Sequence, residues 1–349
     1  MVASFRECYV RISKIILGNV AFTALSFFLN TAAQAADNAF LQAVQNPLLV
    51  QTLYADQHRI LSKVAPDGAI SVNADWENHT GDSYYIEQQR YGGDLIQAGI
   101  ANNNDGQVQE GMKILNWGFA QEAPDGSFPG TGDPFHSTSF FLEASARATL
   151  LLKMSDPVKY ADFIAAASPK IATTAHWMML PDVKSTGQKH SQPYTHRRWI
   201  MAAAMAEAGA LLHDNLLLAE AEGYARAGAA LQQSDGVDPE KGGYDVSYQV
   251  VGLMMASRYY FADTNDERAL AVPVIANGLN WFKTKMQPDG EVDIAGSTRV
   301  GIESGRSGKP KTLDKPAILQ SLVYGAIITH DASYENYARR FAEQIGWLR

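Results

Sequence analysis

The sequence predicts an all-α protein built from repeated helical hairpins, and two observations support this class. A turn signature of Pro, Asp and Gly recurs along the chain, and its aspartates are 58, 57, 53 and 54 residues apart: Asp67, Asp125, Asp182, Asp235 and Asp289. Because Pro fixes φ, Asp hydrogen-bonds nearby backbone and Gly accepts positive φ, each signature marks a corner. The segments between the corners are rich in Ala, Leu and Met and lack the alternation of strands.

Each interval between two corners has room for two helices. The segments with the composition of long helices are, in chain order, 139–154, 197–213, 216–232, 246–261 and 273–286. Residues 137–139 offer N-caps to the first of them. A period near 55 over about 314 residues gives between five and six hairpins, which either stack into an open solenoid or close into a ring. The chain is short and several helices are apolar on more than one face, so we expect a closed ring, an (α/α) toroid.

The first 35 residues are expected to be a secretory signal peptide. Basic residues precede 15–30, a mostly apolar stretch that is too short for a membrane span, and Ala33-Gln34-Ala35 supplies a cleavage site of the small-x-small type. A retained membrane anchor is the alternative. The mature chain, 36–349, would be a single periplasmic or secreted domain without cysteine, because Cys8 is the only cysteine.

Composition and missing motifs exclude several classes of function. With 29 Lys and Arg against 37 Asp and Glu, the net charge of −8 argues against a general nucleic-acid-binding surface. The sequence contains no HExxH, no cysteine pair, no Gly-rich phosphate loop ending in Lys-Ser/Thr and no G-x-S-x-G. We therefore expect no metal or other cofactor in the chemistry, although loop oxygens leave room for a structural Ca²⁺ ion.

Residues with chemical potential gather in the loops, which a rigid ring of helices would hold around one cleft. The candidate loops are 102–107, 125–136, 189–198, 242–249 and 296–316.

The loop before the helix at 197 combines Tyr194, His196, Arg197 and Arg198. A helix N-terminus favours anions, and two arginines add bidentate donors that suit a carboxylate. We interpret this segment as an anion site. The alternative is a cluster of salt bridges between helices.

The loop at 242–249 places Tyr244, Tyr248 and Gln249 one period further along. His196 and Tyr248 are 52 residues apart, so the two side chains could face the same cleft from neighbouring hairpins. Nearby cations would lower the pKa of Tyr248 and let it act as a base. The alternative is a core tyrosine whose hydroxyl is satisfied.

Three further segments could contact a substrate. His136 stands in a Gly- and Pro-rich loop before a helix, where it could also serve only to brace the loop, and Asn103 lies in a run of three asparagines. Neutral His and Asn can stabilise charge that builds on a carboxylate. The segment 296–316 contains Arg299 within a local surplus of basic residues and is expected to be a mobile cover that could bind a polyanion. A merely flexible surface loop is the alternative.

The segments HSTSFFLEASARATLLLK (136–153), YTHRRW (194–199) and GGYDVSYQ (242–249), together with the hairpin period and the export signal, resemble bacterial alginate and glucuronan lyases of the (α/α) toroid type. The likeness is to polysaccharide lyase family 38 and, more distantly, to family 5. Family 5 has an Asn-His pair where this chain has Thr195-His196, which is a departure. The resemblance implies a ring of six or seven hairpins that cleaves 1,4-linked polyuronates such as alginate or glucuronan by β-elimination.

The resemblance and the loop residues together suggest a mechanism. Tyr248 would remove the C5 proton and return a proton to the C4 oxygen, while His196 assists. Arg197 or Arg198, together with His136 and Asn103, would hold and neutralise the substrate carboxylate. Arg299 would bind a neighbouring sugar. The expected substrate-binding residues are Asn103, His136, Tyr194, Arg198, Tyr244, Gln249 and Arg299.

Two other functions remain possible from the sequence. A glycoside hydrolase on the same ring would use two carboxylates as acid and base or nucleophile. Its candidates are Asp125, Asp133, Glu143, Asp235 and Asp245. A sugar-binding protein without chemistry would bind an oligosaccharide and never shorten it.

Overall fold

A computed structural model describes residues 39–72, 81–306 and 308–348, so the expected signal peptide lies outside the described residues. Within these ranges the regular elements are helices, and no strand is formed beyond isolated bridges, as the sequence predicts. The helices are α2 (Pro47–Gln51), α3 (His58–Leu61), α4 (Tyr85–Gln88), α5 (Arg90–Ala101), α6 (Asp105–Ala120), α7 (Pro134–Ser155), α8 (Ala161–Met179), α9 (Pro181–Ser191), α10 (Thr195–Leu212), α11 (Asn215–Ala229), α12 (Val246–Ala262), the 3₁₀ helix η1 (Asp266–Leu270), α13 (Ala271–Lys283), α14 (Lys315–Thr329) and α15 (Ser333–Gln344).

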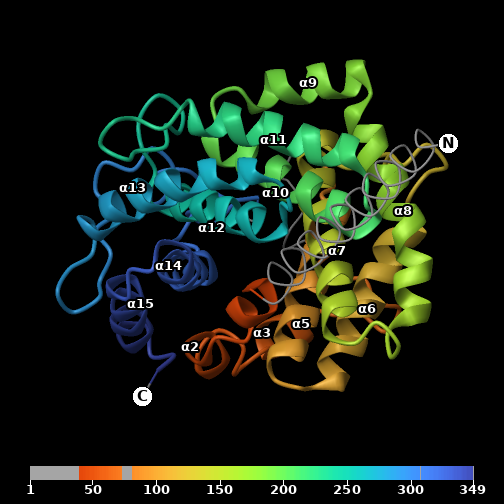
Figure 1. Cartoon of the computed structure of the whole chain (residues 1–349), viewed down its shortest axis with the longest axis horizontal. Helices are drawn as coiled ribbons and strands as arrows, with labels where there is room; N and C mark the ends of the chain where they lie inside the picture. Colours follow the sequence, from red (N-terminus) through yellow and green to blue (C-terminus); the bar gives the residue numbers. More distant parts are fainter. Residues whose placement is uncertain (1–38, 73–80, 307, 349) are drawn as a thin grey trace, which may run out of the picture.

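The long helices form two concentric layers (Figure 1). In the inner layer α5 packs on α7, α7 on α10, α10 on α12 and α12 on α14. Each inner helix is followed by its outer partner, respectively α6, α8, α11, α13 and α15. The ring closes where α5 meets α14, because Nε2 of Gln97 donates to Oε1 of Gln320 at 3.2 Å. The toroid is confirmed.

The described part of the chain contains five hairpins of long helices, fewer than the six or seven that the family resemblance implies. The other helices before α5 are α2, α3 and α4, which have only 5, 4 and 4 residues; α2 contacts α14, and α4 packs on α7. Helices of about one turn cannot form another long hairpin.

The inner helices are buried on more faces than the outer helices, as the sequence predicts for inner helices that are apolar on more than one face. In α10, 14 of the 18 residues are buried. In α15 the buried residues are Tyr334, Ala338, Phe341 and Ala342, whose spacing marks a single helix face.

Four of the five predicted corners form the same turn. In each, the Asp side chain accepts from the backbone N–H two residues later at 3.0–3.1 Å, and the following Gly has a φ of 88–99°. That glycine lies against a backbone carbonyl in the outer helix of the next hairpin, so the turn joins neighbouring hairpins. Pro181-Asp182 marks a corner of another kind: it lies between α8 and α9, and Pro181 stands in the first turn of α9, where its missing N–H costs nothing.

The turns also fix which end of the ring carries the functional loops. The outer helices α6, α11 and α13 lead into them, and the inner helices α7, α12 and α14 begin after them. The N-termini of these inner helices therefore gather at one end, and the short connections from inner to outer helices lie at the other. In the described ranges, no helix has the length and apolar character needed to cross a membrane.

Gly236 provides a test of these turns. Its φ is 91°, and a Cβ at this position would lie 2.3 Å from the carbonyl oxygen of Asn277. Gly236→Ala should lower the free energy of unfolding by ~2 kcal/mol or more, as measured by urea denaturation, since it adds both left-handed strain and a clash. Gly223→Ala is the control: it lies in α11 with nothing within 4 Å of the added Cβ and should stabilise slightly. Equal effects of the two substitutions would contradict this role of the turn.

Candidate active site

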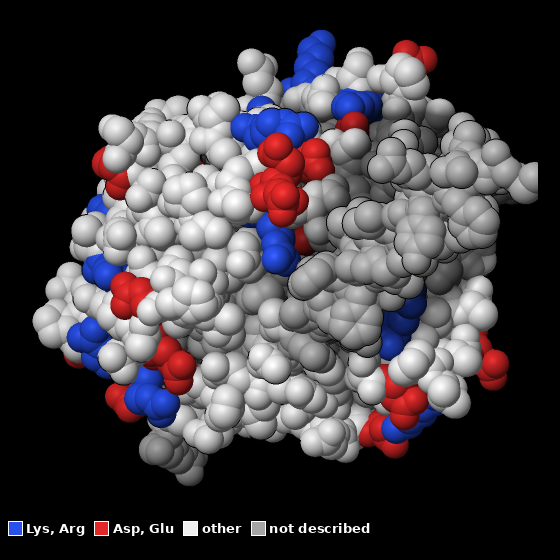
Figure 2. Space-filling view, in the orientation of Figure 1, with Lys and Arg blue, Asp and Glu red and all other residues white. Residues whose placement is uncertain are grey.

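A cavity of about 720 Å³ lies within the ring and is lined by all five inner helices and the loop before α14. Four of its lining residues are acidic: Glu87, Asp94, Glu143 and Asp314. Nine are basic: Arg59, Arg90, Arg147, Arg197, Arg258, Arg299, Arg306, Lys311 and Lys315. On the face shown in Figure 2, by contrast, the coloured acidic and basic side chains lie mostly in small mixed groups. This protein of net charge −8 thus encloses an excess of positive charge, which suits an anionic ligand.

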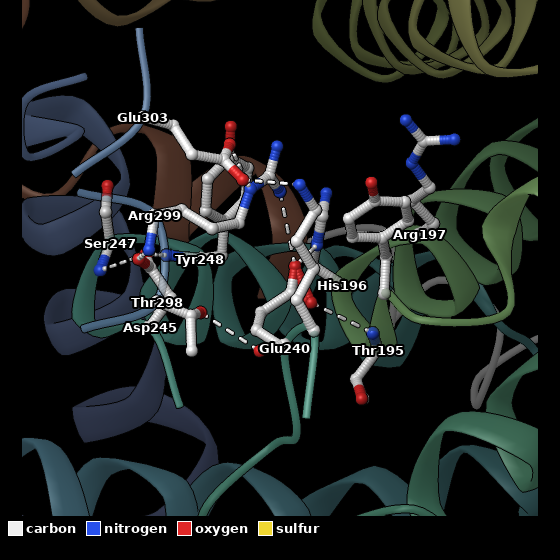
Figure 3. A network of polar contacts seen from close by, with 12 residues as sticks. Thr195, His196, Arg197, Glu240, Asp245, Ser247, Tyr248, Thr298, Arg299 and Glu303 are labelled. Atoms are coloured by element: carbon white, nitrogen blue, oxygen red, sulfur yellow. Dashed lines mark hydrogen bonds and ion pairs between the residues drawn. The ribbon is translucent and has the colours of Figure 1, made fainter. Parts of the chain in front are cut away.

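His196 lies in the first turn of α10 and lines this cavity. Its Nδ1 hydrogen-bonds Oε1 of Glu240 at 2.5 Å, and both side chains are almost completely buried (Figure 3). Because a carboxylate only accepts hydrogen bonds, Nδ1 carries the proton and the lone pair of Nε2 is available. Burial lowers the pKa of His196, while Glu240 opposes that shift. The neutral ring is therefore a candidate general base.

The Tyr248 ring lies beside His196, with ring centroids 4.5 Å apart. The Arg299 guanidinium also contacts the Tyr248 ring and lies 3.8 Å from its centroid. The expected lowering of the Tyr248 pKa was wrong: burial raises it, and the opposing effect of Arg299 is smaller. Tyr248 is thus protonated at neutral pH and is suited to donate a proton. No described residue hydrogen-bonds its hydroxyl.

Asp245 joins the Tyr248 helix to the Arg299 loop. One carboxylate oxygen caps α12 by accepting from the backbone N–H groups of Ser247 and Tyr248 at 3.1 and 2.9 Å. The other accepts from the backbone N–H groups of Arg299 and Val300 at 2.9 and 2.7 Å. This fully buried carboxylate therefore fixes Arg299 over the Tyr248 ring.

Glu303 gathers three cations beside this pair. It accepts from Nε of Arg299 at 3.1 Å and from Nζ of Lys311 at 2.6 Å, and it also pairs with Lys241. Hydrogen bonds from these cations outweigh the opposing effect of burial and lower the pKa of Glu303 to about 2. The segment expected to be a mobile cover is thus held by ion pairs.

His136 and Arg197 complete the cluster, in agreement with their predicted positions in the cleft. The His136 ring centroid is 6.3 Å from that of His196. Burial, followed by the charge of Arg197, lowers the pKa of His136 well below its ordinary value. Arg197 lines the cavity and is held by Asp133, with Nη1 to Oδ2 at 3.0 Å.

Asn103 was wrongly placed in the cleft by sequence reasoning. It is an exposed residue with a φ of 52° in the turn between α5 and α6, at the opposite end of the ring. Its neighbour Asn104 explains this run of polar residues, because the Asn104 side chain caps α6 by accepting from Gln107 N at 3.1 Å.

Four other predicted binding residues are close in sequence to residues that line the cavity, but they do not line it themselves. Arg198 donates to the carbonyls of Ser191 and Tyr194 and faces a separate cavity between α9, α10 and α11. Tyr194 packs behind the site, with the Arg197 guanidinium 4.4 Å from its ring centroid.

Tyr244 and Gln249 have structural roles. The Tyr244 hydroxyl donates to the carbonyl of Ala295 at 2.7 Å. The buried Gln249 side chain bonds the backbone of Gly236 and Asp238 at 3.0 and 2.8 Å, so it ties the turn at Gly236 to α12.

Sequence reasoning missed Glu240, the residue that holds His196. The one signal that could have found it is its place: Glu240 is an acidic residue two positions before the candidate loop 242–249. In the described residues, no group of three or more His, Cys, Asp or Glu side chains is arranged to hold a metal ion.

Most of the carboxylates proposed for a hydrolase are engaged in structural hydrogen bonds or ion pairs. Asp125, Asp235 and Asp245 hold turns or caps, and Asp133 pairs with Arg197. Glu143 lines the cavity but accepts from Arg147 and Arg258 at 2.8 and 2.6 Å, and the charges of these arginines outweigh the opposing effect of burial and lower its pKa. None of these five is placed to act as a protonated general acid.

Comparison with known proteins gives evidence for the fold. No family model and no curated protein matches the chain. Among solved structures, a glycosyl hydrolase family 88 protein from Bacteroides vulgatus aligns with a TM-score of 0.53 at 8% identity, over 87% of this chain and 84% of the other. This likeness shows a shared fold. Two structures align with a TM-score of 0.49 at 13% identity: a protein from Actinoplanes (92% of this chain, 80% of the other) and a polysaccharide lyase (88% and 89%).

The lowered pKa of the buried His136 side chain predicts how the free energy of unfolding depends on pH. Because the folded-state pKa of His136 is lowered, the unfolded chain binds more protons once the pH falls below about 6.5, and the free energy of unfolding decreases by up to about 1.4 kcal/mol per pH unit from this residue. His136→Asn should reduce this slope in urea denaturation between neutral and mildly acidic pH. His190→Asn, at an exposed position of α9, should leave it unchanged. A His136→Asn slope equal to that of the wild type would contradict the assignment.

Proposed function

We propose that this protein is an exported polysaccharide lyase that cleaves a 1,4-linked polyuronate by β-elimination. The observation that carries the proposal is the buried Glu240–His196 pair beside Tyr248, at the edge of a cavity rich in arginine. The export signal expected in the first 35 residues accords with a substrate outside the cytoplasm.

The basic cavity supports an acidic sugar as substrate. The C5 proton of a uronate is only weakly acidic until the charge on its carboxylate is offset. Arg197 and Arg299 flank His196 and Tyr248 and can hold that carboxylate, while neutral His136 can donate a hydrogen bond to it.

The two proton transfers divide between His196 and Tyr248. His196 Nε2 removes the proton from C5, the C–H electron pair forms the C4–C5 double bond, and the C4–O bond breaks. Protonated Tyr248 delivers its proton to the leaving oxygen. This assignment replaces the expectation that Tyr248 performs both steps, because burial raises its pKa and lowers that of His196.

A glycoside hydrolase is the second candidate, because the family 88 protein that shares the fold is a glycosyl hydrolase. Hydrolysis requires a carboxylic acid that stays protonated near neutral pH. Of the four cavity carboxylates, Glu87 and Glu143 have pKa values lowered by arginine charges, and Asp94 pairs with Arg147 at 3.1 Å. Burial raises the pKa of Asp314, but its side chain caps α14 by accepting from Ala317 N at 3.0 Å. These contacts favour the lyase.

Tyr248→Phe tests the proposal directly. With alginate blocks, glucuronan and pectate as a panel, the wild type should produce the ultraviolet absorbance of a conjugated double bond on one of these polymers. Loss of the proton donor should lower kcat by about 10²- to 10⁴-fold and leave KM nearly unchanged.

Tyr244→Phe is the matched control, since its hydroxyl bonds Ala295 outside the cavity, and it should keep activity within a few-fold of the wild type. New reducing ends without the absorbance would indicate hydrolysis instead. Substantial elimination by Tyr248→Phe would remove Tyr248 from the role of acid.

A further inference from the structure

The centre of the ring is sealed below the candidate active site. Glu143 of α7 accepts from Nε of Arg147 and from Nη1 of Arg258. Arg147 reaches Gln97 of α5 at 2.5 Å, and Arg258 of α12 reaches Gln320 of α14 at 3.0 Å. All five side chains are at most 4% exposed. A chain cannot thread through the ring along its axis, because this floor joins four of the five inner helices.

A strap, formed by residues 299–306 and 308–311, crosses above the cavity. It is folded back on itself, with Gly301 N donating to the Lys311 carbonyl at 3.0 Å and Gly305 N to the Lys309 carbonyl at 2.7 Å. Its base is anchored to the N-terminus of α12 by Asp245.

The tip of the strap reaches α4, which packs on α7. Arg306 forms an ion pair with Glu87 of α4, and its guanidinium is 3.5 Å from the centroid of the Tyr84 ring. Glu87 also accepts from Ser137 of α7 at 3.4 Å. Since α7 and α12 are not neighbours in the ring, a strap from α12 to Glu87 spans the mouth of the cavity.

A floor below and a strap across the mouth make the site a pocket and not an open groove. Its volume of about 720 Å³ falls within the range of pockets that enclose most of a small ligand. An extended polymer bound through its interior would need a path out on both sides of the reacting bond.

We propose that the cavity takes the end of an acidic chain, or a short oligouronate, and that the Arg306–Glu87 contact excludes the chain interior. This inference rests on the proposed function and adds to it the class of substrate: chain ends and oligomers. Ion pairing of Arg306 with Glu87 leaves the strap fixed to α4.

Binding stoichiometry tests this inference without requiring turnover. Tyr248→Phe protein is saturated with uronate chains of one composition and several lengths, and light scattering counts the protein molecules bound per chain. We expect the same number on short and long chains, because each chain offers the same ends. A number that rises with chain length would overturn the inference and leave the proposed function standing. No binding to any uronate chain would remove the proposed function together with the inference.

The strap contact is tested in the active enzyme by comparing the fall in polymer viscosity with the rise in absorbance. For the wild type, viscosity should fall slowly for each double bond formed. Arg306→Ala, and independently Glu87→Gln from the α4 side, should make it fall several-fold faster per bond, because chain interiors gain access. Lys309→Ala removes a charge from the same strap outside the cavity lining and should match the wild type. Unchanged ratios in both Arg306→Ala and Glu87→Gln would overturn the role of this contact.

Discussion

The buried Glu240 carboxylate is the interaction on which the candidate active site depends. It accepts from the backbone N–H of Thr195 at 3.2 Å, from Nδ1 of His196 at 2.5 Å and from Nη1 of Arg299 at 3.4 Å (Figure 3). One side chain thus ties the start of α10 to the strap. A buried carboxylate is costly unless it is paired and hydrogen-bonded, and these three contacts supply that pairing.

The same constraint explains how an acidic protein maintains a basic cavity. Most of the arginines that line it are held by carboxylates behind or beside them, as Arg299 is by Glu240 and Glu303, and as Arg147 and Arg258 are by Glu143. These pairs fix the guanidinium groups in place before a ligand arrives. A bound carboxylate then meets oriented donors and loses less side-chain entropy on binding.

The ring could be predicted from the sequence because four turns share one local geometry, and Pro, Asp and Gly favour that geometry. Sequence reasoning placed a site residue correctly only where its position on the helix also turns the side chain toward the cavity. Arg198 and Gln249 directly follow Arg197 and Tyr248, yet one step along a helix rotates a side chain by about 100°, away from the cavity. Asn103 was misplaced because an inner helix carries the chain to the opposite end of the ring, a direction that no local pattern reveals.

The protonation state of His196 tests the central claim most directly. With ¹⁵N-labelled histidine, the ring nitrogen shifts of His196 at neutral pH, assigned by comparison with a His196→Gln spectrum, report charge and tautomer together. We predict a neutral ring with the proton on Nδ1, and loss of that preference in Glu240→Gln, where an amide can donate as well as accept. A charged imidazolium, or a neutral ring with its proton on Nε2, would contradict the assignment of His196 as the base and of Glu240 as the residue that positions it.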